Sequence, residues 1–180
     1  MTSRSGCRNK RPIRRSLIIG PCGSGKSTLA RELAPLLGLP LVHMDQLGWQ
    51  AGWFETEKAE LKARLAEVVA RDEWLIEGNY GSTLGPRLER ADTVIYLDFP
   101  ITLCLSRLTR RIINHRGRSR PDMPEGCLER LDPAFFWYVM NWNTGPRPRT
   151  EAKLATYRGR VIRLTSPHAL AVWRQDNNLG

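Results

Sequence analysis

The sequence predicts one α/β domain, in which a five-stranded parallel sheet carries helices on both faces. Short, almost continuously apolar runs alternate with segments of helical periodicity, which is typical of parallel βαβ units with right-handed crossovers. The length of 180 residues and the hydrophobic content of 41% suit a single domain with a full core. A glycine-rich turn joins the first apolar run to the first helical segment, which indicates a phosphate-binding loop.

The first half of the chain alternates regularly between the two kinds of element. In order, we expect a strand at 16–19, a helix at 26–37, a strand at 41–44, a helix at 56–71, a strand at 74–76 and a helix at 82–90. The first helix should kink or stop near its end, because Pro35 lacks a backbone donor and Gly38 suits a C-terminal cap. Between the second strand and the second helix we expect a loop that carries Trp49 and Trp53.

The second half is less regular. We expect a strand at 93–98, a helix at 101–115, a Gly/Pro/Arg-rich loop at 116–125, helices at 135–142 and 150–157, and a strand at 161–164. A Pro-rich turn should separate those two helices. Ser166 and Pro167 then suit the N-cap and first position of a last helix.

The glycine-rich turn reads G-x-x-x-x-G-K-S in the strand–turn–helix context that the motif requires. Its residues are Gly20, Pro21, Cys22, Gly23, Ser24, Gly25, Lys26 and Ser27. Backbone N–H groups of such a turn point at phosphate oxygens, so the motif predicts an ATP site. We expect Lys26 to reach the β- and γ-phosphates as a catalytic residue and the Ser27 hydroxyl to take one Mg²⁺ position.

Acidic residues follow three of the predicted strands, at the sheet edge where ligands of open parallel sheets bind. Glu77 is a candidate for holding a Mg²⁺-bound water. Asp45 is a candidate for orienting or deprotonating the phosphate acceptor. A helix cap or a surface ion pair is the alternative for each, and for Asp98 a capping role is as plausible as a catalytic one.

Arginines provide the other candidate groups. The helix that contains Arg107, Arg110 and Arg111 leads into a loop with Arg116, Arg118 and Arg120, and together they indicate a lid over about 116–130. Guanidinium groups bind phosphate bidentately and offset charge in the transition state, and a closing lid excludes water. A solvated basic face is the alternative. Arg87 could clamp an acceptor phosphate or carboxylate, or it could pair with Glu89 or Asp92. We assign no chemistry to His43 or His115.

The formal net charge of +10 is concentrated in two places. Residues 1–15 contain six Lys or Arg and no acid, and residues 107–120 contain six Arg and no acid. The rest of the chain is close to neutral, so we expect a disordered basic arm at 1–15 that could bind nucleic acid, followed by a kinase-like domain at 16–180. No membrane span or secretory signal is visible, and the cysteine spacing suits a reducing, cytoplasmic setting.

Five segments of the sequence, the first of which is the phosphate loop with Thr28, resemble those of a known protein family. They are G-P-C-G-S-G-K-S-T, H-M-D ending at Asp45, W-L-I-E-G-N-Y at 74–80, R-L-E-R-A-D-T-V-I-Y-L-D-F-P at 87–100, and R-G-R-S-R-P-D-M at 116–123. Over roughly residues 14–175 the chain resembles adenylate-kinase-related P-loop proteins, and more narrowly those described as DNA topology modulation proteins. The resemblance implies a P-loop NTPase fold of the nucleoside-monophosphate-kinase type with a mobile lid.

The resemblance also implies roles for particular residues. It assigns the stretch from Gly20 to Thr28 to ATP, Asp45 and Arg87 to the acceptor, and the arginines at 116, 118 and 120 to the lid. The segment 46–72 has no clear nucleoside-monophosphate-binding insertion, so a smaller acceptor, of the shikimate- or gluconate-kinase kind, is at least as plausible as AMP.

Three functions are compatible with these features. The first is an ATP·Mg²⁺-dependent phosphotransferase that acts on a small molecule, as a monomer or homodimer. The second is a nucleic-acid-associated ATPase that uses the basic arm and the arginine loop. The third is a nucleotide-binding regulator with little turnover. The charge distribution favours the first, because the body of the chain is not basic.

Overall fold

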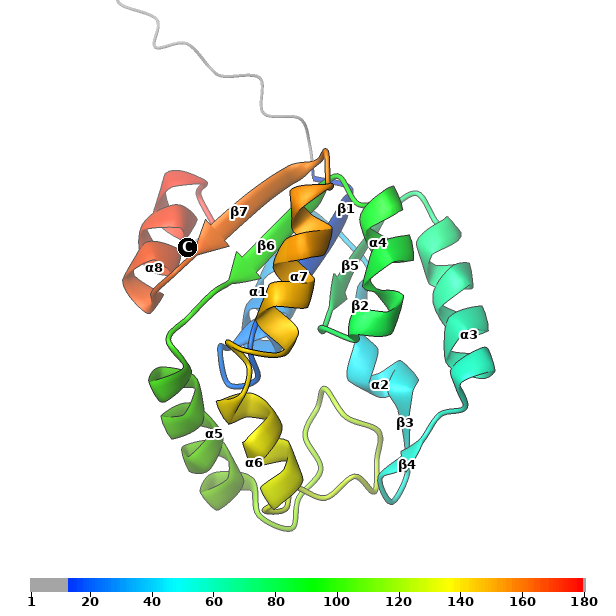
Figure 1. Cartoon of the computed structure of the whole chain (residues 1–180). Coiled ribbons are helices and arrows are strands. Elements are labelled where there is room, and N and C mark those ends of the chain that lie inside the picture. The colour runs from blue at the N-terminus through cyan, green and yellow to red at the C-terminus, as the bar shows by residue number, and fades with distance from the viewer. Residues whose placement is uncertain (1–12, 180) are drawn as a thin grey trace, which may run out of the picture.

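A five-stranded parallel sheet forms the centre of the molecule in the computed structural model, which describes residues 13–179 (Figure 1). Across the sheet the strands are β2 (Leu41–His43), β5 (Trp74–Glu77), β1 (Arg15–Ile19), β6 (Thr93–Leu97) and β7 (Arg160–Leu164). In the central strand, Leu17 lies opposite Ile76 on one side and Val94 on the other. The chain fills one half of the sheet before it crosses β1 to build the other, so the switch point lies at the end of β1.

Helices cover both faces of this sheet, as predicted. One face packs against α1 (Lys26–Leu37) and α8 (Pro167–Asp176), and the other against α3 (Lys58–Ala70), α4 (Leu84–Arg90) and α7 (Pro146–Ala155). Successive strand residues point to opposite faces. Leu17 therefore belongs to the core beneath α3 and α4, whereas its neighbour Ile18 belongs to the core beneath α1.

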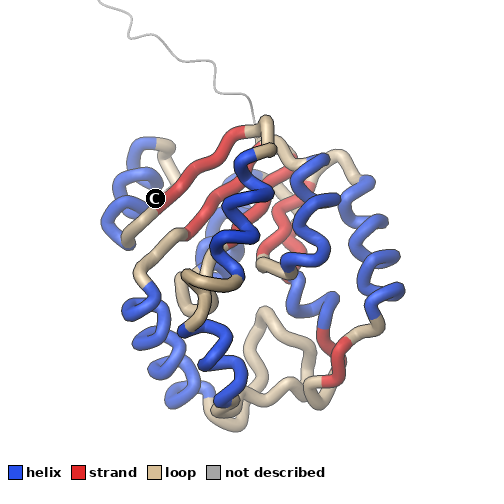
Figure 2. The backbone as a smooth tube through the Cα atoms, in the orientation of Figure 1, coloured by secondary structure: helices blue, strands red, loops and turns tan. Residues whose placement is uncertain are grey.

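The remaining elements gather beyond the carboxyl edge of the sheet (Figures 1 and 2). They are α2 (Met44–Gly48), the antiparallel hairpin of β3 (Trp49–Gln50) and β4 (Phe54–Glu55), the short 3₁₀ helix η1 (Gly81–Thr83), α5 (Ile101–His115) and α6 (Pro133–Met140). The long loop between α5 and α6 lies beside the hairpin. This is the side on which the sequence analysis expected the site.

Most predicted boundaries agree with the structure, including the left-handed C-cap at Gly38 and the Ser166 hydroxyl, which accepts a hydrogen bond from the Ala169 N–H. Residues 46–55 differ, since the predicted loop contains α2 and the hairpin. Helix α7 begins at Pro146, within the segment predicted as a turn. Proline is well suited to the first turn of a helix, where its missing donor would have no partner.

The basic arm predicted at 1–15 falls largely on residues 1–12, outside the described residues. Arg15, predicted in the arm, is instead the first residue of β1. In the part of the chain that the structure describes, no helix combines the length and apolarity that crossing a bilayer requires.

Candidate active site

The phosphate loop has a backbone that only glycine could adopt at two points. Gly20 has φ 143°, and a Cβ there would lie 2.4 Å from the Leu97 carbonyl oxygen. Gly23 has φ 85°, and a Cβ there would lie 2.2 Å from the Cys104 carbonyl oxygen. The Asn79 side chain fastens the start of the loop, since its amide accepts from the Gly20 N–H at 3.0 Å and donates to the Gly20 carbonyl at 2.6 Å. No pattern in the sequence pointed to this role of Asn79.

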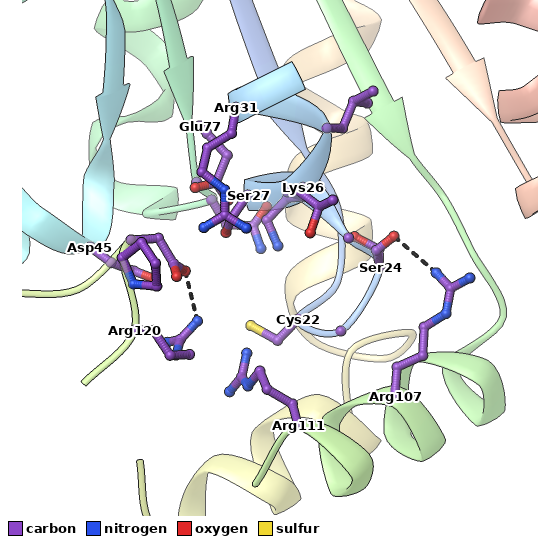
Figure 3. A pocket seen from close by; sticks show the side chains of 18 of the residues that line it. Cys22, Ser24, Lys26, Ser27, Arg31, Asp45, Glu77, Arg107, Arg111 and Arg120 are labelled. Atoms are coloured by element: carbon purple, nitrogen blue, oxygen red, sulfur yellow. Dashed lines mark hydrogen bonds and ion pairs between the residues drawn. The ribbon is translucent and has the colours of Figure 1, made fainter. Parts of the chain in front are cut away.

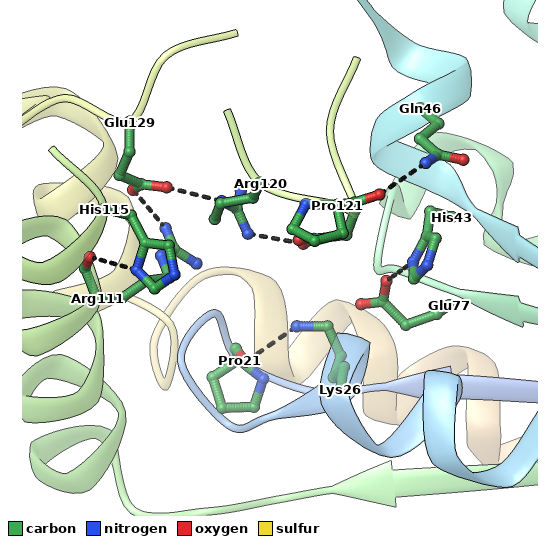
Figure 4. Close-up of polar contacts among 11 residues, drawn as sticks. Pro21, Lys26, His43, Gln46, Glu77, Arg111, His115, Arg120, Pro121 and Glu129 are labelled. Carbon is green, nitrogen blue, oxygen red and sulfur yellow. Dashed lines mark hydrogen bonds and ion pairs between the residues drawn. The ribbon is translucent and has the colours of Figure 1, made fainter. Parts of the chain in front are cut away.

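The loop opens into a cavity of about 980 Å³ between the sheet edge, α5 and the long loop (Figure 3). Ten of the predicted site residues line it: Cys22, Gly23, Ser24, Gly25, Lys26, Ser27, Thr28, Asp45, Glu77 and Arg120. Gly20, Pro21, Arg87, Arg116 and Arg118 are absent from its lining. The buried Lys26 amine donates to the Pro21 carbonyl at 3.1 Å, which keeps it folded over the loop (Figure 4). The loop thus has the shape and the donors to hold a polyphosphate.

The two strand-end acids lie in different surroundings. Asp45, in the first turn of α2, is half-buried, and burial raises the pKa of its carboxyl, with the negative charge of Glu77 adding to the rise and Lys26 opposing it. The Tyr80 side chain lines the same cavity as Asp45. Tyr80 adopts φ 36°, an unusual backbone conformation for a non-glycine residue, and such conformations cluster at functional sites.

Glu77, at the end of β5, is almost fully buried and makes a 3.0 Å contact with His43 Nδ1 (Figure 4). His43 could not be assigned a role from the sequence, because it has no partner at ligand spacing. Among residues 13–179, no three His, Cys, Asp or Glu side chains group closely enough to hold a metal by themselves. A Mg²⁺ ion would therefore need the Ser27 hydroxyl, water and phosphate oxygens, which is the donor set that this ion commonly uses.

The long loop places one of its three predicted arginines in the cavity. Arg120 forms 2.7 Å ion pairs with both Asp122 and Glu129, and Glu129 also pairs with Arg111 of α5 at 3.0 Å (Figure 4). Burial opposes ionisation of Asp122, but Arg120 and hydrogen bonds, one of them from Ser27, leave its pKa below the ordinary value. Arg116 and Arg118 are exposed, so in this conformation they do not reach the cavity.

The same loop is fastened to the β3–β4 hairpin. The Gly52 N–H donates to the Gly126 carbonyl at 3.3 Å, and the Trp53 indole N–H donates to the Leu128 carbonyl at 2.9 Å. The Gln46 amide of α2 donates to the Pro121 carbonyl at 3.0 Å (Figure 4). Segments about 75 positions apart in the chain are thus bonded to each other, and both contribute to the cavity lining, through Trp49 and Glu55 on one side and Pro121 on the other.

Arg107 of α5 is a further lining residue. It donates to the Ser24 carbonyl at 3.3 Å and lies over the Phe99 ring, 5.7 Å from the centroid. Arg107 and Arg111 were predicted in the helix that leads to the lid, but neither was predicted as a site residue. Both arginines lie on the face of α5 that is turned toward the phosphate loop. Which face this is depends on how α5 packs, so the sequence alone does not reveal it.

Arg87 requires a correction. Its guanidinium is fully buried and turned away from the cavity, and it donates to the backbone carbonyls of Gly78, Asn79, Tyr80 and Thr83. Burial lowers the pKa of Arg87 to about 9 while Glu77 opposes the shift, so the group stays charged near neutral pH. A guanidinium whose three nitrogens all bond to carbonyls inside the protein cannot clamp an acceptor. It instead holds the 78–80 turn, and with it Asn79 and Tyr80, in place.

We therefore expect Arg87→Met to lower the free energy of unfolding by about 2–4 kcal/mol, because it leaves several buried carbonyls without donors. Urea unfolding near neutral pH would measure the change. The exposed Arg90 on the same helix offers a matched control, and Arg90→Met should stay within about 0.5 kcal/mol of the parent. If Arg87→Met kept the stability of the parent but lost acceptor affinity, the structural role would be wrong. The prediction that Arg87 binds the acceptor would then be the correct one.

The chain is similar in sequence to shikimate kinases. It is 34% identical over 160 residues to the shikimate kinase of Halorhodospira halophila (strain DSM 244 / SL1), a match that covers 77% of this chain and 89% of that protein. It is 29% identical over 154 residues to the shikimate kinase of Acinetobacter baumannii (strain AYE), covering 71% and 82% respectively. No protein-family model matches the chain.

Two solved structures share the fold. One is a shikimate kinase from Acinetobacter baumannii in complex with shikimate, with a TM-score of 0.56 and 20% identity over 93% of this chain and 92% of that one. The other is a shikimate kinase from Bacteroides thetaiotaomicron, with a TM-score of 0.53 and 15% identity over 92% and 96%. These likenesses confirm the predicted P-loop fold with its five-stranded parallel sheet.

Proposed function

Since the chain belongs to the shikimate kinase family of ATP-dependent P-loop kinases, we propose that it transfers the γ-phosphoryl group of ATP, with Mg²⁺, to a hydroxyl group of a small molecule. The observation that carries this proposal is that Asp45 shares one cavity with residues 22–28 of the phosphate loop. A carboxylate at that place can accept a proton, and the loop can hold the donor.

In the proposed reaction the acceptor oxygen forms a bond to the γ-phosphorus while the bond from that phosphorus to the bridging oxygen of ADP breaks. The acceptor proton passes to the Asp45 carboxylate, whose raised pKa favours taking it up. Lys26 stabilises negative charge on the transferred group. Arg120 also lines the cavity and can stabilise negative charge on the transferred group. Arg116 and Arg118 remain candidates that would need movement of the loop to contact phosphate.

The residues present fit Mg²⁺ as the companion ion. Ser27 would bind it directly, and we propose that Glu77, held by His43, binds one of its waters. When bound, the ion would offset the charge of the phosphate oxygens. Asp122 lines the same cavity as Ser27, so its carboxylate is a further oxygen ligand available there.

A phosphorylation screen with labelled ATP tests the proposal. We expect Lys26-dependent labelling of a hydroxyl compound in a panel of sugars, nucleosides, hydroxy acids and amino alcohols, with shikimate included because relatives are named for it. Label that instead appears as free phosphate, at a rate that DNA increases, would point to a nucleic-acid-associated ATPase. The narrower likeness to DNA topology modulation proteins, nucleic-acid binding by the arm, the domain boundary at residue 15 and the monomeric or dimeric state all stay predictions.

A further inference from the structure

Two arginines from different elements lie at the phosphate loop. Helix α5 runs along the loop, since the Arg107 guanidinium donates to the Ser24 carbonyl at 3.3 Å. Arg111 follows one turn later and therefore lies on the same face of the helix. Arg120 comes from the long loop between α5 and α6. Both Arg111 and Arg120 line the cavity together with residues 22–28, and Figure 3 shows the two side chains beside the tip of the phosphate loop.

The Glu129 carboxylate joins these two arginines. Its Oε1 accepts a hydrogen bond from Arg111 Nη2 at 3.0 Å, and its Oε2 forms an ion pair with Arg120 Nε at 2.7 Å (Figure 4). The Glu129 side chain is only 4% exposed, and Glu129 is absent from the cavity lining. Two guanidinium groups held this close repel each other, and the buried carboxylate between them offsets that repulsion. Glu129 can therefore act on the cavity only through the arginines that it holds.

The backbone of Glu129 is held independently of its side chain. Its N–H donates to the Arg118 carbonyl at 3.0 Å, and its carbonyl accepts from the Gly117 N–H at 3.1 Å. These two bonds pair the beginning of the long loop with its end, so the Glu129 side chain starts from a fixed point. We therefore expect a replacement of this side chain to leave the backbone of the loop in place.

Both arginines keep N–H donors that the protein does not use. Within residues 13–179, the Arg111 guanidinium donates only to Glu129, and that of Arg120 donates only to Asp122. The buried Nε of each has no hydrogen-bond partner there, because the contact of Arg120 with Glu129 lacks the alignment of a hydrogen bond. A guanidinium has five N–H donors, and phosphate oxygens accept such donors in pairs. The unused donors beside a phosphate loop therefore point to a phosphoryl group as the acceptor.

We propose that Glu129 is a positioning residue for the transfer reaction. It holds Arg111 and Arg120 together at the phosphate loop, so that both guanidinium groups bind oxygens of the phosphoryl group while it is transferred. This inference rests on the proposed function and adds a residue that touches neither the nucleotide nor the acceptor. A carboxylate that merely competed with phosphate for the arginines would have the opposite effect, because its removal would make transfer faster.

The test compares Glu129→Gln with Glu125→Gln in a transfer assay. Glu129→Gln keeps the shape of the side chain and removes its charge, so kcat should fall by about 10²-fold while KM for ATP changes by less than about threefold. Glu125 is exposed in the same loop and outside the cavity lining, so Glu125→Gln should transfer at the parental rate. In an Arg120→Gln background, Glu129→Gln should cost only about tenfold, because one of its two partners is already gone. Equal losses in both backgrounds, or faster transfer by Glu129→Gln, would overturn the inference.

Binding gives a second reading that does not depend on turnover. Fluoroaluminate, added with ADP and Mg²⁺, imitates the transferred group and should raise the melting temperature of the parent above the value with ADP and Mg²⁺ alone. Glu129→Gln should keep the shift caused by ADP and lose the additional one. A merely structural role would lower the melting temperature of the free protein and leave the additional shift unchanged, which would contradict the inference.

Glu129→Asp serves as the test if the Gln variant does not fold. It keeps the charge but is one methylene shorter, too short to hold both arginines, so kcat should fall by about tenfold with the ADP shift retained. If the parent transfers phosphate and binds fluoroaluminate while no Glu129 variant that folds differs from Glu125→Gln, the inference alone is wrong. No transfer to any compound and no fluoroaluminate shift in the parent would overturn the proposed function and this inference with it.

Discussion

Lys26→Ala is expected to reduce phosphoryl transfer by about 10³-fold, because it removes a buried positive charge that we place at the transferred group. The fold should remain, since the Lys26 amine bonds only to the nearby Pro21 carbonyl and makes no ion pair among the described residues. ADP release and thermal melting, followed on the same samples, would measure both properties.

Lys58→Ala is a suitable control, because Lys58 is an exposed residue at the start of α3 and lies outside the cavity. It should leave both transfer and melting temperature unchanged. If Lys26→Ala turned over ATP as fast as this control does, the assignment of the glycine-rich turn as the catalytic phosphate site would be refuted.

Asp45→Asn is expected to lower transfer by about 10²–10⁴-fold, the usual range for a positioned acid or base, while the affinity for ATP with Mg²⁺ changes little. The exposed Asp72 provides the matched control, and Asp72→Asn should retain full transfer. Equal rates in the two variants would show that Asp45 has no part in the chemistry. Nucleotide titration and a transfer assay with the acceptor from the screen would separate the two effects.

The raised pKa of Asp45 adds a pH dependence to this prediction. Transfer by the parent should rise with pH through a value above the ordinary Asp pKa of about 3.9, and Asp45→Asn should lack this rise. A carboxyl whose pKa is higher in the folded state stabilises the fold when protonated, and that contribution is lost as the pH rises through the folded-state pKa. Near neutral pH the Asn variant should therefore be at least as stable as the parent, and the difference should vanish in acid.

The parts of the molecule that could be predicted depend on local chemistry. The phosphate loop is recognisable because its glycines must adopt positive φ and approach neighbouring carbonyls, so few residue types are possible there. The sheet is recognisable because doubly covered strands must be apolar on both faces. Asp45 and Glu77 could be placed near the loop because the carboxyl ends of parallel strands meet at one edge.

The parts that could not be predicted depend on long-range packing. Arg87 was expected in the cavity because its position in the chain is close to the site, but the direction of its side chain is decided by four backbone carbonyls that no local pattern reveals. The contact of His43 with Glu77 joins two neighbouring strands and requires their register. The hairpin at 49–55 has strands of two residues each, too short for a periodic signal.

The bonds between the long loop and the β3–β4 hairpin have a consequence for exchanging parts between members of the family. Gly52, Trp53 and Gln46 each bond to a backbone carbonyl of the loop, so the loop depends on a segment encoded about 75 residues earlier. If residues 116–130 were replaced by those of a relative, the new loop would lack the 46–55 segment to which it bonds in that relative. A graft that also carried 46–55 would bring its own support, together with Trp49 and Glu55 of the cavity lining. Acceptor preference and loop sequence should therefore be inherited as a pair.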